Sequence, residues 1–219
     1  MQNIKMLKNS LISIAATLLL AACSSETAQP EFTFDGTVEG HDGQKAYLYV
    51  LLPEYQELMA IDSAKIKSGA FHFEGTVDKP MEAIVKLQGD SVICPFVLTN
   101  NQLAMQIESG TYSIQGSQSN KRLSAMLAER TRFAEHRGDL QKEYKRHIAD
   151  TTLTRILDDS LALAYQQAGV DYRKRLLTHF TRNAEHYPVM CRTALRIFSK
   201  DLYQSQADSV LSLLSNQKK

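Results

Sequence analysis

The sequence predicts an α+β protein, with an N-terminal antiparallel β-sandwich or partly closed barrel over residues 32–116 and a C-terminal α-helical bundle over residues 117–219. Short runs rich in Val, Ile, Phe and Tyr, separated by Gly, Asp, Asn and Pro, fill the first region and are strand and turn signals. After Gly116, apolar residues instead recur every three or four positions, which is the spacing of a helix. This change of period is the clearest internal division of the chain.

Eight strands are expected in the first region. Alternation is clearest at residues 70–74, where Phe71 and Phe73 share one face. The segments 41–43 and 67–69 both end in glycine, the residue for which a positive φ costs least in a tight turn. Because no helical pattern separates the strands, a sandwich or partly closed barrel is favoured. The expected strands are 32–39, 45–52, 58–66, 70–77, 82–88, 92–98, 103–108 and 111–115.

Five helices are expected in the second region. The first contains no Pro and only one Gly, Gly138, and its apolar stripe is interrupted by Arg130 and Arg137. Gly169 is interpreted as the C-cap of the second helix. Pro188 is expected either to close the third helix or to start the fourth. The expected helices are 119–149, 152–168, 171–186, 189–201 and 205–215.

Residues 1–22 are predicted to be a lipoprotein signal peptide. Lys5 and Lys8 precede an apolar run over residues 11–20, which leads into the sequence Leu-Ala-Ala-Cys ending at Cys23. The run is too short for a transmembrane helix, which needs about 20 apolar residues. Leu-Ala-Ala-Cys resembles the lipobox of bacterial lipoproteins, which implies cleavage between Ala22 and Cys23 and anchoring to a lipid bilayer through acylated Cys23. An ordinary signal peptide with an incidental cysteine is the alternative.

The segment after the cleavage point is expected to be a lipidated tether over residues 23–31, because it is polar and poor in apolar groups. By resemblance to other bacterial lipoproteins, Ser24 implies sorting to the outer membrane, with either face open. The expected location is therefore the cell envelope.

Composition argues against a nucleic-acid partner. The chain has 25 basic and 24 acidic residues, and removing the signal peptide with its two lysines leaves 23 basic and 24 acidic residues in 197. That length suits one domain, or a modest domain with an appendage. Cys94 and Cys191 are expected to be separate buried thiols, although an oxidising envelope would also allow them to pair.

The sequence predicts no catalytic or cofactor-binding residue. Asp62 next to Ser63 could suggest a nucleophile beside an acid, but adjacent strand residues point to opposite faces. A hydrogen bond from one of these side chains to the backbone is the favoured interpretation. The chain also contains no Gly-rich phosphate loop, no Gly-x-Ser-x-Gly and no His-Glu-x-x-His.

No metal site is predicted either. His136 and His147 are eleven residues apart on one expected helix, and His179 and His186 are seven apart on another. Those intervals separate each pair by two or three helical turns, too far to share one ion without other ligands. Surface or interfacial histidines are therefore expected.

Two further groups of residues have both a functional and a structural interpretation. The basic runs at 142–147 and 173–175 are interpreted as solvated helix faces with nearby acids, and contact with anionic lipid head groups is the alternative. Four tyrosines could line a ligand cleft between a sheet edge and a loop, although strand alternation also accounts for them. They are Tyr47, Tyr49, Tyr55 and Tyr112.

Several short motifs, taken in order, resemble domain of unknown function 4369. The segments that carry the resemblance are 36–43 (GTVEGHDG), 61–64 (IDSA), 69–75 (GAFHFEG), and Gly116-Ser117 with Asn120. This domain is typically the N-terminal part of lipid-anchored envelope proteins that continue into a linker bundle and a thioredoxin-like, AhpC/TlpA-type module. The resemblance therefore implies a location and a fold. The Cys-x-x-Cys of that module is not in this sequence, and no catalytic residue can be carried over.

The leading functional hypothesis is a non-catalytic, lipid-anchored envelope module that binds a protein or a small ligand through sheet edges or amphipathic helices. The alternative is an accessory or truncated relative of a thioredoxin-like thiol-disulfide oxidoreductase lipoprotein, with such a lipoprotein as its partner. That alternative requires an accessible thiolate at Cys94 or Cys191. A hydrolase would require a cleft in which Asp62, Ser63 or the histidines converge.

Overall fold

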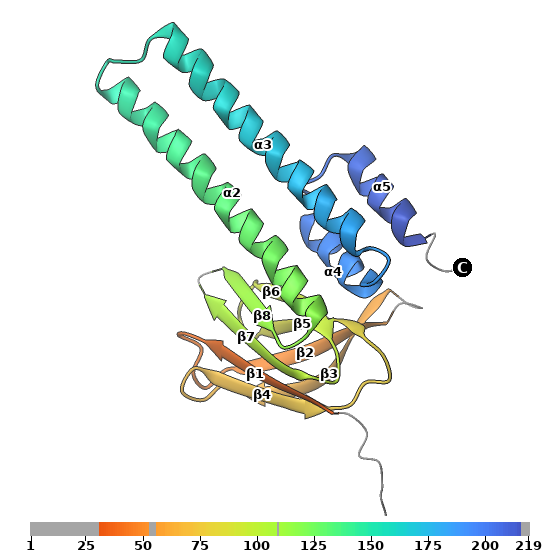
Figure 1. The fold of residues 1–219 in the computed structure, drawn as a ribbon. Helices are drawn as coiled ribbons and strands as arrows, with labels where there is room; N and C mark the ends of the chain where they lie inside the picture. The colour runs from red at the N-terminus through yellow and green to blue at the C-terminus, as the bar shows by residue number, and fades with distance from the viewer. Residues whose placement is uncertain (1–30, 53–55, 109, 216–219) are drawn as a thin grey trace, which may run out of the picture. The chain divides into compact units, whose positions relative to one another are not determined.

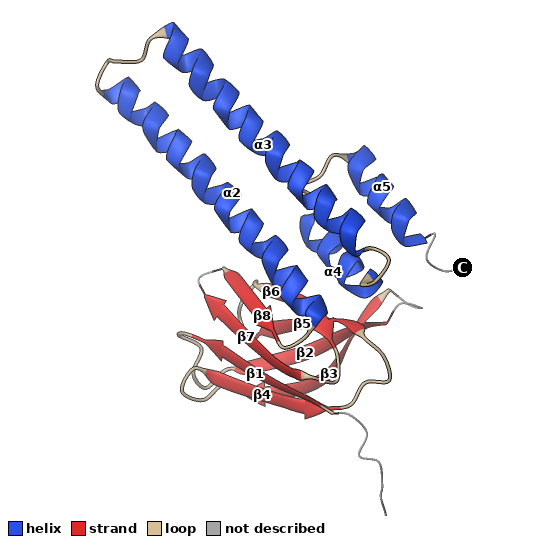
Figure 2. Ribbon diagram, in the orientation of Figure 1, coloured by secondary structure: helices blue, strands red, loops and turns tan. Residues whose placement is uncertain are grey.

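The computed structural model describes residues 31–52, 56–108 and 110–215, which pack as one compact unit. Two four-stranded sheets are followed by four helices (Figures 1 and 2), so the predicted α+β class is confirmed and the sheets are not closed into a barrel. The predicted signal peptide at 1–22, the lipidation site Cys23, the tether up to residue 30, and Tyr55 lie outside the described residues. Within the described residues, no helix has the length and apolarity to cross a bilayer.

The eight strands form two sheets, one with the order β4-β1-β7-β8 and the other with the order β3-β2-β5-β6. Neighbouring strands pair antiparallel except β1 and β7, which are parallel with Phe34 opposite Leu103. This departure from the predicted antiparallel pairing arises because the chain leaves the first sheet to build the second and returns in the direction of β1. The strands are β1 (Phe32–Val38), β2 (Lys45–Leu52), β3 (Glu57–Lys65), β4 (Ala70–Gly75), β5 (Met81–Leu87), β6 (Ile93–Leu98), β7 (Gln102–Glu108) and β8 (Thr111–Gln115).

Aromatic side chains join the two sheets. Phe34 of β1 lies at the centre, with its ring centroid 5.0 Å from that of Phe96 on the opposite sheet. Phe71 and Phe73 of β4 contact Phe34 from the side, at 6.1 and 5.9 Å. All four side chains are buried, as the alternation around residues 70–74 predicts. Each buried aromatic contributes a few kcal/mol by removing apolar surface from water.

The two predicted glycine turns are confirmed. Gly43 and Gly69 have φ angles of +84° and +72°. Ser68 also has a positive φ, and Lys67 and Ala70 exchange both backbone hydrogen bonds around it, so a tight two-residue turn leads from β3 in one sheet to β4 in the other.

The helical region has four helices, α2 (Gln118–Ala149), α3 (Arg155–Asn183), α4 (Pro188–Phe198) and α5 (Gln204–Ser215). The prediction of two helices separated at Gly169 is wrong, because α3 runs through this residue without a break. Gly169 and Ala168 are buried, and packing outweighs the cost of glycine in a helix, about 1 kcal/mol relative to alanine. Pro188 occupies the first turn of α4, one of the two roles expected of it.

The parts of the helices nearest the sheets share one hydrophobic core with them. Helix α4 contacts β5 and β6, and the outward-facing Val97 of β6 is buried. Helices α2 and α3 pack together, with the rings of Phe133 and Tyr172 stacked 4.2 Å apart. From residue 134 to its end, in contrast, α2 has no fully buried residue. Figure 2 shows this upper part of the α2–α3 hairpin extending beyond α4 and α5.

The first turns of α2 attach the helix to both sheets. Ser117 caps the helix by accepting a hydrogen bond from the backbone N–H of Asn120 at 3.1 Å. The buried amide of Asn120 bonds to β6, with Oδ1 accepting from the Val97 N–H at 2.9 Å and Nδ2 donating to the Val97 carbonyl at 2.8 Å. One turn later, the Ser124 hydroxyl accepts from the Ile114 N–H of β8 at 3.0 Å and donates to its carbonyl. Since β6 and β8 are edge strands of different sheets, α2 closes both edges at this point.

We predict that Asn120→Ala lowers the free energy of unfolding by roughly 2–4 kcal/mol, because it leaves a buried N–H and a buried carbonyl of Val97 without partners. Urea unfolding followed by circular dichroism measures the change. Lys121→Ala, at the exposed neighbouring position, is the matched control and should remain close to wild type. Equal stabilities of the two variants would show that the amide bridge does not hold the helix.

Candidate functional site

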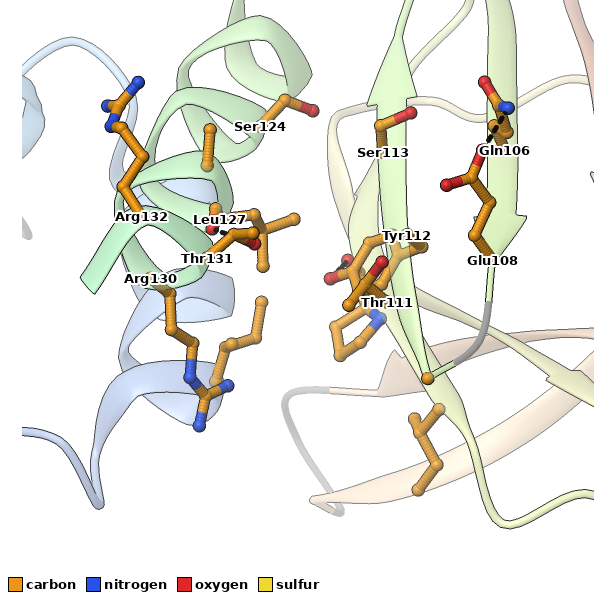
Figure 3. Close-up of a pocket in the computed structure, with 15 residues that line it drawn as sticks. Gln106, Glu108, Thr111, Tyr112, Ser113, Ser124, Leu127, Arg130, Thr131 and Arg132 are labelled. Atoms are coloured by element: carbon orange, nitrogen blue, oxygen red, sulfur yellow. Dashed lines mark hydrogen bonds between the residues drawn. The ribbon is translucent and has the colours of Figure 1, made fainter. Parts of the chain in front are cut away.

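An open cleft of about 630 Å³ lies between strand β8 and helix α2, just beyond the point where Ser124 joins them. Figure 3 shows the two walls, with Thr111, Tyr112 and Ser113 on the strand and Leu127 and Thr131 on the helix. The full lining consists of Ile93, Pro95, Gln106, Glu108, Gly110, Thr111, Tyr112, Ser113, Ser124, Leu127, Ala128, Arg130, Thr131, Arg132 and Ile197. These residues come from β6, β7, β8, the loop before β8, α2 and α4.

A tyrosine ties the strand wall of the cleft to the opposite sheet. The Tyr112 hydroxyl donates a hydrogen bond to the backbone carbonyl of Pro95 on β6. Burial raises the pKa of the Tyr112 phenol far above its ordinary value, so it remains a neutral donor at physiological pH. Pro95 has no backbone N–H, which limits the pairing that the edge of β6 can offer.

The two arginines on the helix wall already have acidic partners. Arg130 lies 3.1 Å from Asp201, which also accepts from the Tyr172 hydroxyl at 3.0 Å. Arg132 lies 2.6 Å from Glu129. Burial acts to raise the pKa of the Glu129 carboxyl, but Arg132 and Arg175 outweigh it and hold that pKa below its ordinary value. These charges therefore brace α2 against α3 and the α4–α5 connection, and they are largely neutralised at the cleft.

The remaining lining groups suit binding by shape and hydrogen bonding. Ile93, Leu127 and Ile197 provide apolar contact surface. Hydroxyls of Thr111, Ser113 and Thr131, together with the Gln106 amide, provide neutral hydrogen-bonding groups at the rim. The Gln106 amide donates to Glu108.

Asp62 and Ser63 do not line this cleft. Both are exposed on β3, and Asp62 Oδ1 accepts from the Ser63 backbone N–H at 2.6 Å. The favoured interpretation, a side-chain bond to the backbone, is confirmed. A bulge in the pairing with β2 leaves Ile61 as the extra residue beside Asp62, so the segment has a local structural explanation.

The four helix histidines are not brought together. His136 is exposed on α2, and His147 bonds through Nδ1 to the Thr152 hydroxyl at 2.8 Å beside the loop that joins α2 to α3. Burial lowers the pKa of the half-buried His179, while His186 lies in the turn before α4. In the described ranges, no group of three or more His, Cys, Asp or Glu could hold a metal ion.

The structure describes three of the four tyrosines considered as cleft residues. Of these three, Tyr112 alone lines this cleft. Tyr47 and Tyr49 lie beside each other on β2 with ring centroids 6.4 Å apart, as strand alternation on one face predicts. In the basic runs, Arg175 pairs with Glu129 and Lys142 with Asp139, both at 3.0 Å, as expected of solvated faces with nearby acids.

The two cysteines of the folded region are separate and buried. Cys94 is 1% exposed and Cys191 is fully buried, and both are free. Burial raises the pKa of the Cys94 thiol to about 12 and that of Cys191 to about 11. The prediction of separate buried thiols is confirmed, and both thiols lack the accessible thiolate that disulfide exchange requires.

The sequence segments that match a known family coincide with the sandwich and the start of α2. The family model covers residues 32–123, from the first residue of β1 to the second turn of α2. These residues form a domain of unknown function, DUF4369. No curated protein matches the chain.

The motifs of the DUF4369 domain have structural explanations here. At Gly36, an added Cβ would lie within 1.9 Å of the Phe71 ring, so only glycine allows this ring to pack across β1. Gly116 has a φ of +105°, and a Cβ there would meet the Gln102 carbonyl oxygen at 1.9 Å. Gly116 thus turns the chain out of β8, and Ser117 and Asn120 then start α2 and fasten it to β6.

Sequence reasoning did not find most of the cleft. Arg130 is predicted only as an interruption of the apolar stripe of the first helix, and Ile93 and Ser113 fall within predicted strands without any functional signal. No spacing in the sequence signals that they converge, because the residues lie on three strands and two helices whose relative placement depends on tertiary contacts.

We predict that neither Cys94 nor Cys191 reacts with a thiol reagent in the native protein, and that both react after unfolding. At mildly alkaline pH nearly all of each thiol is protonated, since the pKa values of about 12 and about 11 lie well above it. Titration of the Cys23→Ser variant with Ellman's reagent, with and without denaturant, measures this. Fast native reaction of either thiol would restore the redox-accessory hypothesis.

Proposed function

We propose that this protein is a non-catalytic, lipid-anchored protein of the cell envelope that binds an extended segment of a partner protein in the cleft between β8 and α2. The observation that carries the proposal is an open cleft along the edge of a β-sheet, with apolar contact surface and neutral hydrogen-bonding groups on its walls. Its volume falls within the range of about 300–1,000 Å³ that is typical of ligand sites.

The orientation of β8 supports an extended peptide as the ligand. Strand β8 pairs with β7 on one side, while on the other side the N–H and carbonyl of Ile114 bond to Ser124. Backbone groups of an antiparallel strand point to the same side at every second residue, so those of Tyr112 are directed toward the cleft. A peptide lying there would continue the edge pairing that Ser124 begins, which is β-strand addition.

Apolar side chains at the cleft supply contact for alternate side chains of such a peptide. Ile93 is 51% exposed on the edge strand β6, and Leu127 of α2 also lines the cleft. Main-chain pairing would then provide affinity, and these contacts would provide selectivity.

The anchor in this proposal is acylated Cys23, supported by the basic residues, apolar run and Leu-Ala-Ala-Cys of the N-terminus. Nine residues from Cys23 to Glu31 precede β1, and they can span at most about 30 Å. The sandwich would therefore work close to a membrane surface, and Ser24 favours the outer membrane. Because Cys94 and Cys191 are buried, no observation favours the alternative as a thiol-redox accessory.

For the anchor, we predict that Cys23→Ser abolishes incorporation of an alkyne-tagged fatty acid in bacterial cells and moves the protein out of the membrane fraction. Only the Cys23 sulfur and the amine exposed by cleavage can carry the acyl chains in this proposal. Cys94→Ala is the matched control and should keep both label and membrane association, since this thiol is buried. Labelling that persists in Cys23→Ser would refute the anchor.

For the cleft, we predict that a random dodecapeptide library panned against the purified protein yields ligands that protect the amide of Tyr112 from hydrogen exchange, because this N–H points away from β7. Ile93→Glu should weaken these ligands about tenfold or more, equivalent to about 1.4 kcal/mol of lost contact. Ile148→Glu on α2 is the control, since Ile148 is 50% exposed and Ile93 51%. Equal loss in both variants, or no enriched peptide, would contradict the proposed binding site.

A further inference from the structure

Helix α3 carries an exposed apolar stripe with a period of seven residues. Ile156, Leu163 and Val170 are 82%, 65% and 50% exposed. Seven residues are close to two turns of an α-helix, so these three side chains lie in one row. Leu161 and Ala168, which are buried, lie on the other side of α3, the side that packs toward α2. The stripe is thus an unpartnered face of the upper hairpin.

The lower end of the stripe enters a basic groove between α3 and the start of α5. Val170, Leu177 and Tyr203 supply its apolar surface, and the Arg173 guanidinium lies 4.3 Å from the centre of the Tyr203 ring. Lys174 and Arg182 also line this groove. The upper end has a net negative charge, because Asp158 and Asp159, which follow the exposed Ile156, outnumber Arg155, which precedes it.

The charge distribution points to a second copy of this chain as the partner, and we infer that two copies pair antiparallel through α3. In this register Leu163 packs against Val170 of the second copy, and Ile156 packs against Leu177 in the basic groove. Asp159, one turn after Ile156, then faces Arg173 of the second copy, and Gln166 faces its own counterpart. Two-fold symmetry makes each of the unlike contacts occur twice.

A parallel arrangement would lose this complementarity, because it would place Asp159 beside Asp159 and Arg173 beside Arg173. A single apolar residue per heptad makes a narrow seam, so the ion pairs at its ends select orientation and register more than they add affinity. None of the residues in this seam lines the cleft between β8 and α2. The pairing therefore stands independently of the proposed function.

Disulfide trapping in the full chain tests the pairing directly. Gln166→Cys places a thiol opposite itself across the two-fold axis, within the Cα separation of about 7 Å that a disulfide can bridge. Ala162→Cys, an exposed and uncharged position on the same helix but off the stripe, is the matched control. Mild oxidation of the purified full chain should give roughly tenfold more disulfide-linked dimer for Gln166→Cys than for Ala162→Cys.

Exchanging the charges of Asp159 and Arg173 distinguishes the proposed register from cross-linking by random collision. In the Gln166→Cys background, Asp159→Arg or Arg173→Asp alone should reduce cross-linking, and the two together should restore it, because the ion pair is then reversed. Equal cross-linking of Gln166→Cys and Ala162→Cys would overturn the inference, as would failure of the double exchange to restore cross-linking. Cross-linking of Gln166→Cys to a protein of a different mass would assign the stripe to another partner and overturn it as well.

Discussion

The attachment of α2 to both sheet edges is the constraint on which the arrangement of residues 31–215 depends. Through Asn120 the helix satisfies the backbone of Val97 on β6, and through Ser124 it satisfies that of Ile114 on β8. Two short polar side chains, one turn apart, thereby take the place of strands at the edges of two different sheets. A helix fastened in this way keeps the sandwich open at that end, in agreement with the absence of barrel closure.

The direction of α2 then determines what lies around it. Because Ser124 holds the helix against β8 and the helix then leads away, a wedge opens between Tyr112 and Thr131, and this wedge is the cleft (Figure 3). Farther along, Phe133 stacks on Tyr172 and Arg130 reaches Asp201, which brings α3 and the connection to α5 against α2. Beyond these contacts the hairpin has no fully buried residue on α2, and the apolar stripe of α3 is exposed there.

The sequence pattern predicts most of the individual strands and helices but not how they pack together. Strand ends lie within two residues of those predicted. Alternating apolar residues such as Phe71 and Phe73 mark a strand with one buried face, and this pattern can be read directly from the sequence. Gly169 was misleading because a glycine at a helix end and a buried glycine inside a helix look the same in sequence. The parallel pairing of β1 with β7 joins segments about seventy residues apart and has no local signal. The cleft follows from tertiary contacts, with Tyr112 its one residue that was anticipated as a cleft residue. Asn120 belongs to a family motif, but its role depends on Val97, which is distant in sequence and bonds to the Asn120 amide only in the folded structure.

The central claim is that α2 makes the sheet edges and the helices one cooperative structure, and native-state hydrogen exchange of the Val97 and Ile114 amides tests it most directly. Both N–H groups are bonded to side chains of α2 rather than to a neighbouring strand. If the claim is correct, these amides exchange only through global unfolding, with the same opening free energy as the amide of Leu48 in the buried strand β2. Exchange of Val97 and Ile114 at a much lower free energy than Leu48 would show that α2 detaches while the sandwich stays folded, and would contradict this account.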